Sequence, residues 1–148
     1  MTWAWPIPEG LHVLPNGSWQ VGDQPVRHEA SLRYLKAHLS FDDGAAVVDG
    51  DKRVPVVVEG PPFEVVRLDV DAGRGECRVA LDDGSEETVA DDALEMSDAT
   101  GRFECAVRGG RAKAMLSRSA HQALLKAVVQ EGGAFFLEAG PRRIRIRT

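Results

Sequence analysis

"GGAFFLEAGPRRIRIRT" (132–148) decides the fold, because an earlier stretch, "DGAAVVDGDKRVPVVV" (43–58), follows the same pattern. In both, glycine and alanine open a short apolar run, an acidic residue follows, and glycine leads into a basic pair and an alternating strand. Gly44 aligns with Gly133 and, after one inserted residue, Gly50 aligns with Gly140. An apolar strand, a glycine turn and a second strand of period two predict a β-hairpin. The chain therefore carries two similar hairpins.

An amphipathic helix is predicted before each hairpin, over 29–39 and over 117–130, because apolar residues recur at helical spacing. Ser117 is a good N-cap and Gly132 a good residue to follow the second helix. A Leu-Lys-Ala triplet recurs in the two helices at an offset of 90 residues. The two helices therefore extend the repeat upstream.

A further hairpin is predicted before each helix. "SWQVGDQPV" turns at Gly22-Asp23 and "FECAVRGGRAKAML" turns at Gly109-Gly110. A Gly-Gly pair suits a two-residue type I′ turn, in which both central residues have positive φ. Each half of the chain thus reads as hairpin, helix, hairpin.

The stretch between the halves alternates apolar and polar residues around two glycine turns, which predicts an antiparallel meander. The predicted fold is α+β, with two similar lobes built as a hairpin–helix–hairpin repeat, a meander between them, and two main helices covering strand-rich sheets. Pro61-Pro62 marks the boundary. The predicted domains are an N-terminal lobe, 1–60, and a C-terminal lobe, 61–148, which joins the meander (61–101) to the second copy (102–148).

Charge is divided unevenly along the chain. The net charge is −5, but residues 1–101 carry −12 and residues 102–148 carry +7. Such asymmetry favours an anionic partner for the basic part or two lobes that attract each other. There is no signal peptide and no membrane-spanning run, so the expectation is a cytoplasmic protein without a membrane partner. Cys77 and Cys105 lie in strand-like alternation and are expected to be buried, inert thiols.

Known catalytic patterns are missing from the sequence. No Ser/His/Asp or Cys/His signature is present, the four histidines are scattered without metal-ligand spacing, and the paired aspartates sit at expected turns. No catalytic or metal-binding residue is therefore assigned, and the sequence indicates no particular cofactor.

Two arginines and a tryptophan are the candidate ligand-binding residues. Arg108 is expected on the polar side of a strand, and Arg118 in the first turn of the second helix, where the helix dipole disfavours a cation. Compensation would come from an acidic residue of the other lobe, or from an anionic small molecule clamped between the lobes. Trp19, on the equivalent hairpin of the first lobe, would supply an apolar wall or belong to the core.

Four motifs in order resemble the bacterial family known as domain of unknown function 1285, over about residues 10–140. They are "NGSWQVGDQPVRHEASLRYL", "VEGPPFEVVRLDV", "FECAVRGGRAKAMLSRSAHQALL" and "GGAFF". The resemblance implies two lobes of repeated α+β motifs and a role in ligand binding or signal transduction. It supplies no catalytic residues. The family's Pro-Val-Glu stretch is replaced here around Gly50-Asp51-Lys52, so a polar site built on that glutamate would be altered.

The leading functional hypothesis is a non-catalytic small-molecule-binding or signal-transduction module with its site between the lobes. The alternatives are an enzyme with an unrecognised active site in the interlobe cleft and a nucleic-acid binder that uses Arg143, Arg145 and Arg147. The acidic total charge argues against nucleic acid. We expect these arginines to face acidic residues of the first lobe and meander, or solvent at a sheet edge. A homo-oligomer is compatible with the sequence.

Overall fold

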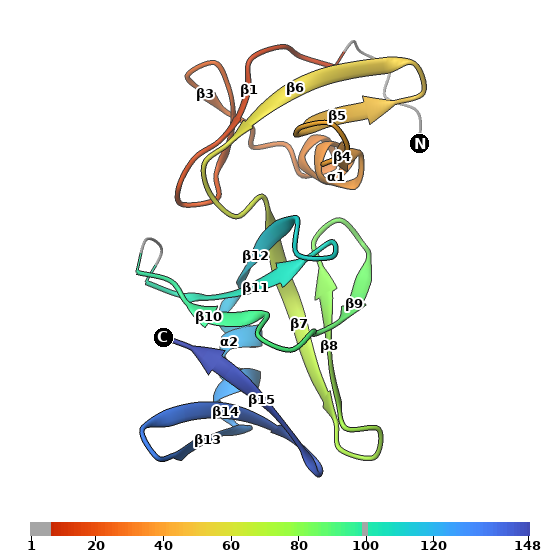
Figure 1. Cartoon of the computed structure of the whole chain (residues 1–148). Coiled ribbons are helices and arrows are strands. Elements are labelled where there is room, and N and C mark those ends of the chain that lie inside the picture. The colour runs from red at the N-terminus through yellow and green to blue at the C-terminus, as the bar shows by residue number, and fades with distance from the viewer. Residues whose placement is uncertain (1–6, 99–100) are drawn as a thin grey trace. The chain divides into compact units, whose positions relative to one another are not determined.

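A computed structural model of the chain describes residues 7–98 and 101–148 and confirms the α+β class. The chain divides into two compact units, Met1–Pro62 and Phe63–Thr148, called the N-terminal and C-terminal units below. This boundary lies two residues after the division at residue 60 that the sequence predicts. Among the described residues, each unit has one helix and its own β-sheet (Figure 1).

The N-terminal unit is built on a sheet of six described strands in the order β3-β2-β1-β6-β5-β4. The first and last strands lie side by side at the centre and run parallel, while the other neighbours are antiparallel. The elements are β1 (Leu11–Val13), β2 (Trp19–Val21), β3 (Gln24–Pro25), α1 (Glu29–Ala37), β4 (Leu39–Ser40), β5 (Ala46–Asp49) and β6 (Lys52–Val58).

The C-terminal unit has a sheet of nine described strands in the order β13-β14-β15-β10-β11-β12-β7-β8-β9. β10 with β15 and β12 with β7 are its parallel pairs. The elements are β7 (Phe63–Asp71), β8 (Glu76–Leu81), β9 (Glu86–Thr88), β10 (Leu94–Met96), β11 (Phe103–Val107), β12 (Ala112–Leu116), α2 (Arg118–Leu125), β13 (Val128–Glu131), β14 (Ala134–Ala139) and β15 (Arg142–Arg147).

Six strands of the C-terminal sheet share the connectivity of the N-terminal sheet. β12-β11-β10-β15-β14-β13 repeats the order β3-β2-β1-β6-β5-β4, and in both units the helix follows the hairpin at one end of this series. The central parallel pairs have matching registers, with Leu11 opposite Val56 and Leu94 opposite Ile146. β6 and β15 therefore take equivalent places in their sheets. The origin of this likeness in a repeat stays a prediction.

Both helices end earlier than the sequence predicts. Leu39 and Val128, which complete the expected apolar faces, instead begin strands β4 and β13 and pair with Val47 and Leu137. The two positions fit either period, because an apolar residue that follows a short helix can equally open a strand. The Leu-Lys-Ala match is also misleading, since Leu125 is 52% exposed and the buried counterpart of Leu35 is the preceding leucine.

The helix starts follow local capping chemistry. Ser117 is the N-cap of α2, as predicted, and its Oγ accepts a hydrogen bond from the Ala120 N–H at 3.2 Å. His28 takes the same role in α1, where its Nδ1 accepts from the Ser31 N–H at 3.3 Å. Gly132 does not follow a helix, which corrects the prediction, because it lies in the β13–β14 turn with φ 61°.

The β11–β12 turn is longer than the predicted two-residue turn. Val107 and Ala112 are the last opposed residues, so four residues connect the strands. Gly109 and Gly110 have positive φ values of 66° and 85°, as expected, and Arg108 joins them with φ 55°. Arg108 is thus a turn residue and not the polar side of a strand, because the pairing ends one residue earlier than its alternation suggests.

The C-terminal sheet curls so that its distant turns meet. Gly140, in the β14–β15 turn, lies so close to the β7–β8 turn that a β-carbon there would sit 3.0 Å from the Ala72 carbonyl carbon and closer still to its oxygen. The Arg142 guanidinium donates to the Gly75 carbonyl at 3.4 Å in the same place. The curl encloses a core of alternating strand residues, in which Cys77 and Cys105 are fully buried as predicted.

Candidate functional site

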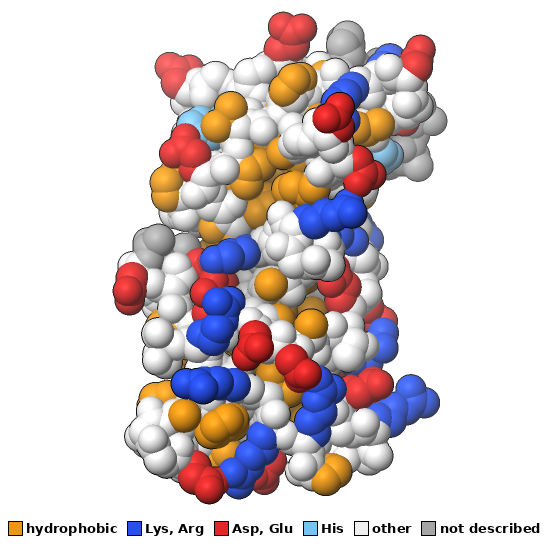
Figure 2. All heavy atoms as spheres, viewed as in Figure 1, with side chains coloured by type: hydrophobic (Ala, Val, Ile, Leu, Met, Phe, Trp, Pro, Cys, Tyr) orange, Lys and Arg blue, Asp and Glu red, His pale blue; other side chains and the backbone are white. Residues whose placement is uncertain are grey.

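β15 carries a row of arginines on one face, which we call the arginine face: Arg143, Arg145 and Arg147. They alternate with Ile144 and Ile146, which are buried, because successive side chains of a strand point to opposite faces. β15 lies between β14 and β10, so the alternative of a solvent-exposed sheet edge is wrong. Acidic and basic side chains are interspersed over this unit in Figure 2.

Acidic neighbours occupy both ends of the arginine face. Arg143 forms ion pairs with Glu131 and, at 3.5 Å, with Glu138. The hydrogen bond and charge of Glu131 raise the pKa of the Arg143 guanidinium above its ordinary value. Arg147 pairs with Glu95 of β10 at 3.4 Å. Two of the three arginines are thus compensated by strands of their own sheet, and Glu95 belongs to the predicted meander.

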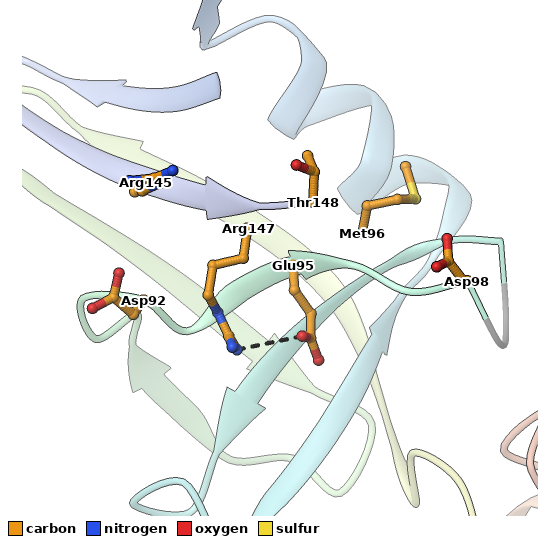
Figure 3. A pocket seen from close by; sticks show the side chains of 7 residues that line it. All are labelled: Asp92, Glu95, Met96, Asp98, Arg145, Arg147 and Thr148. Atoms are coloured by element: carbon orange, nitrogen blue, oxygen red, sulfur yellow. Dashed lines mark ion pairs between the residues drawn. The ribbon is translucent and has the colours of Figure 1, made fainter. Parts of the chain in front are cut away.

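The middle residue of the row is different. Arg145 is exposed, and among residues 7–98 and 101–148 its side chain has no hydrogen-bond or ion-pair partner. It lines a surface pocket of about 740 Å³ beside β10 and β15 (Figure 3). The residues around this pocket are Asp92, Glu95, Met96, Asp98, Arg145, Arg147 and Thr148.

The charged side chains of this pocket fall into two groups: those with an ion-pair partner and those without one among the described residues. Glu95 pairs with Arg147 and also with Lys113 of β12. Asp92 and Asp98 are exposed and, like Arg145, have no side-chain partner among the described residues. In Figure 3, Arg145 and Asp92 lie on one side of the Arg147–Glu95 pair and Asp98 on the other. The side-chain charges without a partner among the described residues are therefore a guanidinium and two carboxylates.

The fold does not need an arginine at the pocket. β6 has the same neighbours in its sheet as β15, and its register places Pro55 and Val57 where β15 has Arg145 and Arg147. The N-terminal sheet forms with an imino acid and an apolar residue at these positions. Arg145 therefore needs an explanation other than the stability of the sheet.

Trp19 is a core residue of the N-terminal unit. Its side chain is 2% exposed, and the indole Nε1 donates a hydrogen bond to the Pro62 carbonyl at 2.9 Å. A buried indole N–H needs such an acceptor. The alternative of a core tryptophan thus matches its place in the structure.

Arg108 is held by residues of its own unit. Its guanidinium forms ion pairs with Asp83 and Glu87 and lies 5.0 Å from the ring centre of Phe63. Its backbone N–H donates to both Glu87 carboxylate oxygens, at 3.0 and 3.1 Å. The acids that neutralise Arg108 thus come from the β8–β9 turn and from β9, both in the predicted meander.

Arg118 is the exposed first residue of α2, and among the described residues its side chain has no partner. β12 separates it from Arg108, and five strand residues span about 17 Å. The structure thus does not bring the two arginines together. The site that they would form with Trp19 between the lobes stays a prediction.

Sequence reasoning missed the acidic side of the pocket. Asp92 and Asp98 flank β10, a three-residue strand that the meander prediction does not single out. Their position beside Arg145 depends on the parallel pairing of β10 with β15, which joins residues about 50 positions apart. The one available signal was the contrast between "RRIRIR" and "KRVPVVV", which shows that arginine is dispensable to such a strand.

The remaining candidates for a reactive site are the two cysteine thiols and clusters of metal-binding side chains. Burial, followed by the charge of Asp69, raises the pKa of the Cys77 thiol to about 12. Burial, Cys77 and Glu87 in turn raise the pKa of the Cys105 thiol to about 12. No group of three or more His, Cys, Asp or Glu side chains is arranged to hold a metal ion among the described residues. None of the described helices is long and apolar enough to cross a bilayer.

Two solved structures are similar to this chain. A DUF1285 family protein from Silicibacter pomeroyi DSS-3 superimposes with a TM-score of 0.72 at 21% identity, covering 95% of this chain and 81% of that one. The chain has the fold of a DUF1285 protein. A DUF1285 family protein from Shewanella baltica OS155 gives 0.59 at 15% identity, covering 80% and 91% of the two chains. No family model and no curated protein matches the sequence. The resemblance to DUF1285 that the motifs indicate is thus confirmed by the fold.

Proposed function

We propose that this chain is a non-catalytic small-molecule-binding module whose pocket beside β10 and β15 binds an anionic group through Arg145. The observation that carries the proposal is the free guanidinium of Arg145 in a pocket, within a row whose other arginines have acidic partners. A guanidinium presents a planar fork of donors that matches a carboxylate or phosphate in two parallel hydrogen bonds.

The surroundings of Arg145 also favour a specific site over a general basic surface. Arg142, Arg143 and Arg147 each have an acidic partner, so the strand presents one free cation and not a continuous positive stripe. A nucleic-acid surface needs several free cations to neutralise phosphates. A pocket with one free arginine suits a small ligand. Coupling of this binding to a signalling partner is the natural extension of such a module.

An internal duplication would explain why the two sheets share their connectivity although β15 has Arg145 and Arg147 where β6 has Pro55 and Val57. The shared connectivity supports two copies of one unit, of which the C-terminal copy acquired the arginines and the extra strands β7, β8 and β9. The free cysteines Cys77 and Cys105 further support a reducing compartment, and we propose a cytoplasmic location on that ground.

The proposal is tested by following backbone amide shifts of the labelled full chain while single carboxylates and inorganic phosphate are added. We expect saturable shifts centred on β15 and β10. Arg145→Gln should weaken binding at least about tenfold, since a hydrogen bond to a charged group contributes about 1.5 kcal/mol or more. Arg143→Gln, which changes a paired arginine on the same face, is the matched control and should leave binding within about twofold.

A result in which both variants bind alike, or in which no anion produces saturable shifts at the pocket, would contradict the proposed function. Shifts that spread evenly over all basic residues would do the same, because they would indicate screening of charge in place of a site.

A further inference from the structure

We propose that the ligand of Arg145 is a small aromatic carboxylic acid, whose carboxylate meets the guanidinium and whose ring lies against Phe136 on the neighbouring strand. This inference rests on the proposed function and names the ligand class. It follows from two side chains that are adjacent on one sheet face: a guanidinium without a partner among the described residues and a half-buried aromatic ring.

The strand register places Phe136 directly beside Arg145. The two residues are opposite one another in the β14–β15 ladder. Glu138, two residues after Phe136, pairs with Arg143 on the arginine face. Phe136 therefore belongs to the same face, because side chains two residues apart on a strand point the same way. Directly opposed residues of an antiparallel pair have β-carbons about 4.5–5.5 Å apart, so one small molecule can contact both side chains.

Phe136 carries its ring on the side of β14 that faces away from the core. Glu138 on that side is exposed, whereas Leu137 and Ala139 on the opposite side are fully buried. Phe136 itself is half-buried, so part of its ring stays in contact with water. Removal of this area from water favours a ligand that brings a ring of its own, because aromatic pairs gain from stacking as well as from burial.

The fold does not require the ring any more than it requires the arginine. The register of the N-terminal sheet places Ala46 opposite Pro55, at the positions where the C-terminal sheet has Phe136 opposite Arg145. Ala46 is fully buried. The equivalent strands thus pair with a methyl group and an imino ring, and both members of the aromatic–guanidinium pair are particular to the C-terminal unit.

The lining of the pocket decides on which side of Arg145 the ligand ring can lie. On the β10 side (Figure 3) the lining is mostly polar: Asp92, Glu95, Asp98 and Thr148. An apolar ring there would remove oxygen atoms from water without replacing their hydrogen bonds, which is costly. On the β14 side, Phe136 lies opposite Val129 of β13, and both are half-buried. The ring therefore extends from Arg145 across β14, where two strand spacings of roughly 10 Å in total suit an acid with two fused rings.

The experiment compares three carboxylates of increasing ring size in the labelled full chain: acetate, benzoate and naphthoate. Naphthalenemethanol, which has two rings and no carboxylate, is the fourth compound, and amide shifts of β13, β14 and β15 are the readout. We expect naphthoate to bind about fivefold more tightly than acetate, with benzoate between them, because ring burial adds to the same ion pair. Naphthalenemethanol should bind at least about tenfold more weakly than naphthoate, since it lacks the charged hydrogen bonds.

Two phenylalanines on opposite faces of β14 give a matched pair of variants. Phe136→Leu should lower the preference for naphthoate over acetate about threefold and leave the affinity for acetate unchanged, because it keeps an apolar side chain and removes the flat ring. Phe135→Leu makes the same change on the other face, where Phe135 is 36% exposed, and should leave the preference unchanged. Arg145→Gln should weaken the binding of all three acids.

Equal binding of naphthoate and acetate to the unaltered chain would overturn the inference. A naphthoate preference that survives Phe136→Leu, or that falls as far in Phe135→Leu, would do so too. If these results came with an anion affinity that still depends on Arg145, the proposed function would stand and the ligand class would be wrong. If no compound bound in a manner that depends on Arg145, both would be wrong.

Discussion

Two arginines of the C-terminal unit show how a residue's role depends on its neighbours. Arg108 lies in a turn, and its guanidinium forms an ion pair with Asp83, whose side chain is only 3% exposed. Arg145 lies in a regular strand and faces a pocket without a partner among the described residues. The motif resemblance points to Arg108, yet it is Arg145 that has donors to offer a ligand.

Two glycines with positive φ allow a prediction that separates strain from crowding. Gly110 has φ 85° and open space around its Cα, whereas Gly140 has φ 59° and lies against the Ala72 carbonyl. Gly110→Ala should lower the free energy of unfolding by about 1–2 kcal/mol, the cost of a left-handed alanine. Gly140→Ala should cost about 1–3 kcal/mol more, because a backbone group must also move.

Urea unfolding of both variants measures this difference directly. Equal losses would show that the β7–β8 turn yields easily, and the close approach of the two turns would then contribute little to the C-terminal unit.

The two buried thiols make stability depend on alkaline pH. In the folded chain the pKa of Cys77 and Cys105 rises from 9.0 to about 12, so between these values only the unfolded state releases their protons. The contribution of each thiol is fully present below pH 9.0 and is lost as pH rises toward about 12. The loss is at most about 1.4 kcal/mol per pH unit for each thiol.

The measurement is the free energy of unfolding at a series of pH values above neutrality. Cys105→Ala should lower stability at every pH, because it leaves a cavity, yet give a shallower decline above pH 9.0. A slope that is unchanged in this variant would indicate that other groups cause the alkaline loss.

At the scale of elements, the β8–β9 turn is held by the buried side chain of Asp83. Asp83 Oδ1 accepts from the Ser85 N–H at 2.9 Å and from the Ser85 hydroxyl at 2.6 Å, and its other oxygen meets Arg108. Asp83→Ala should reduce the free energy of unfolding by about 2–3 kcal/mol, because two donors and a half-buried guanidinium lose their acceptor.

Asp69→Asn is the matched control, since it removes an acid from the exposed Arg67–Asp69 pair of the same unit. Exposed pairs contribute about 0–1 kcal/mol, so denaturant curves of this variant should almost overlay those of the unaltered chain. Equal effects of the two substitutions would mean that Asp83 does not organise the turn.

At the same scale, the sequence predicts strands and turns more reliably than it predicts partners. Alternation identifies β15, and the Gly22-Asp23 turn joins β2 to β3 with two residues, as expected. The predicted helix ends are wrong because Leu39 and Val128 fit both a helical and a strand period. The pocket could not be predicted, for a different reason. Local patterns do not show that β10 lies beside β15, since that contact forms only in the folded sheet.

For the molecule as a whole, the distribution of charge predicts poor binding to nucleic acid. The net charge is −5, and most arginines of β15 have acidic partners. At about 150 mM salt, fluorescence anisotropy should show no specific binding of DNA or RNA, because few phosphates can be neutralised. Submicromolar binding that is lost when Arg143, Arg145 and Arg147 are all changed to Gln would contradict this expectation.

The parallel pairs β1–β6 and β10–β15 set the order in which the chain can fold during its synthesis. β6 completes the N-terminal sheet, so that sheet can close once residue 58 has left the ribosome. β15 lies between the β13–β14 hairpin and the six other strands of its sheet. Until residue 147 emerges, no strand pairing joins these two parts of the sheet. Until then, both edges that β15 will join expose unpaired backbone groups. The nascent C-terminal unit thus passes most of its synthesis in a form that a chaperone can bind, and a stall just before β15 would leave it vulnerable to aggregation.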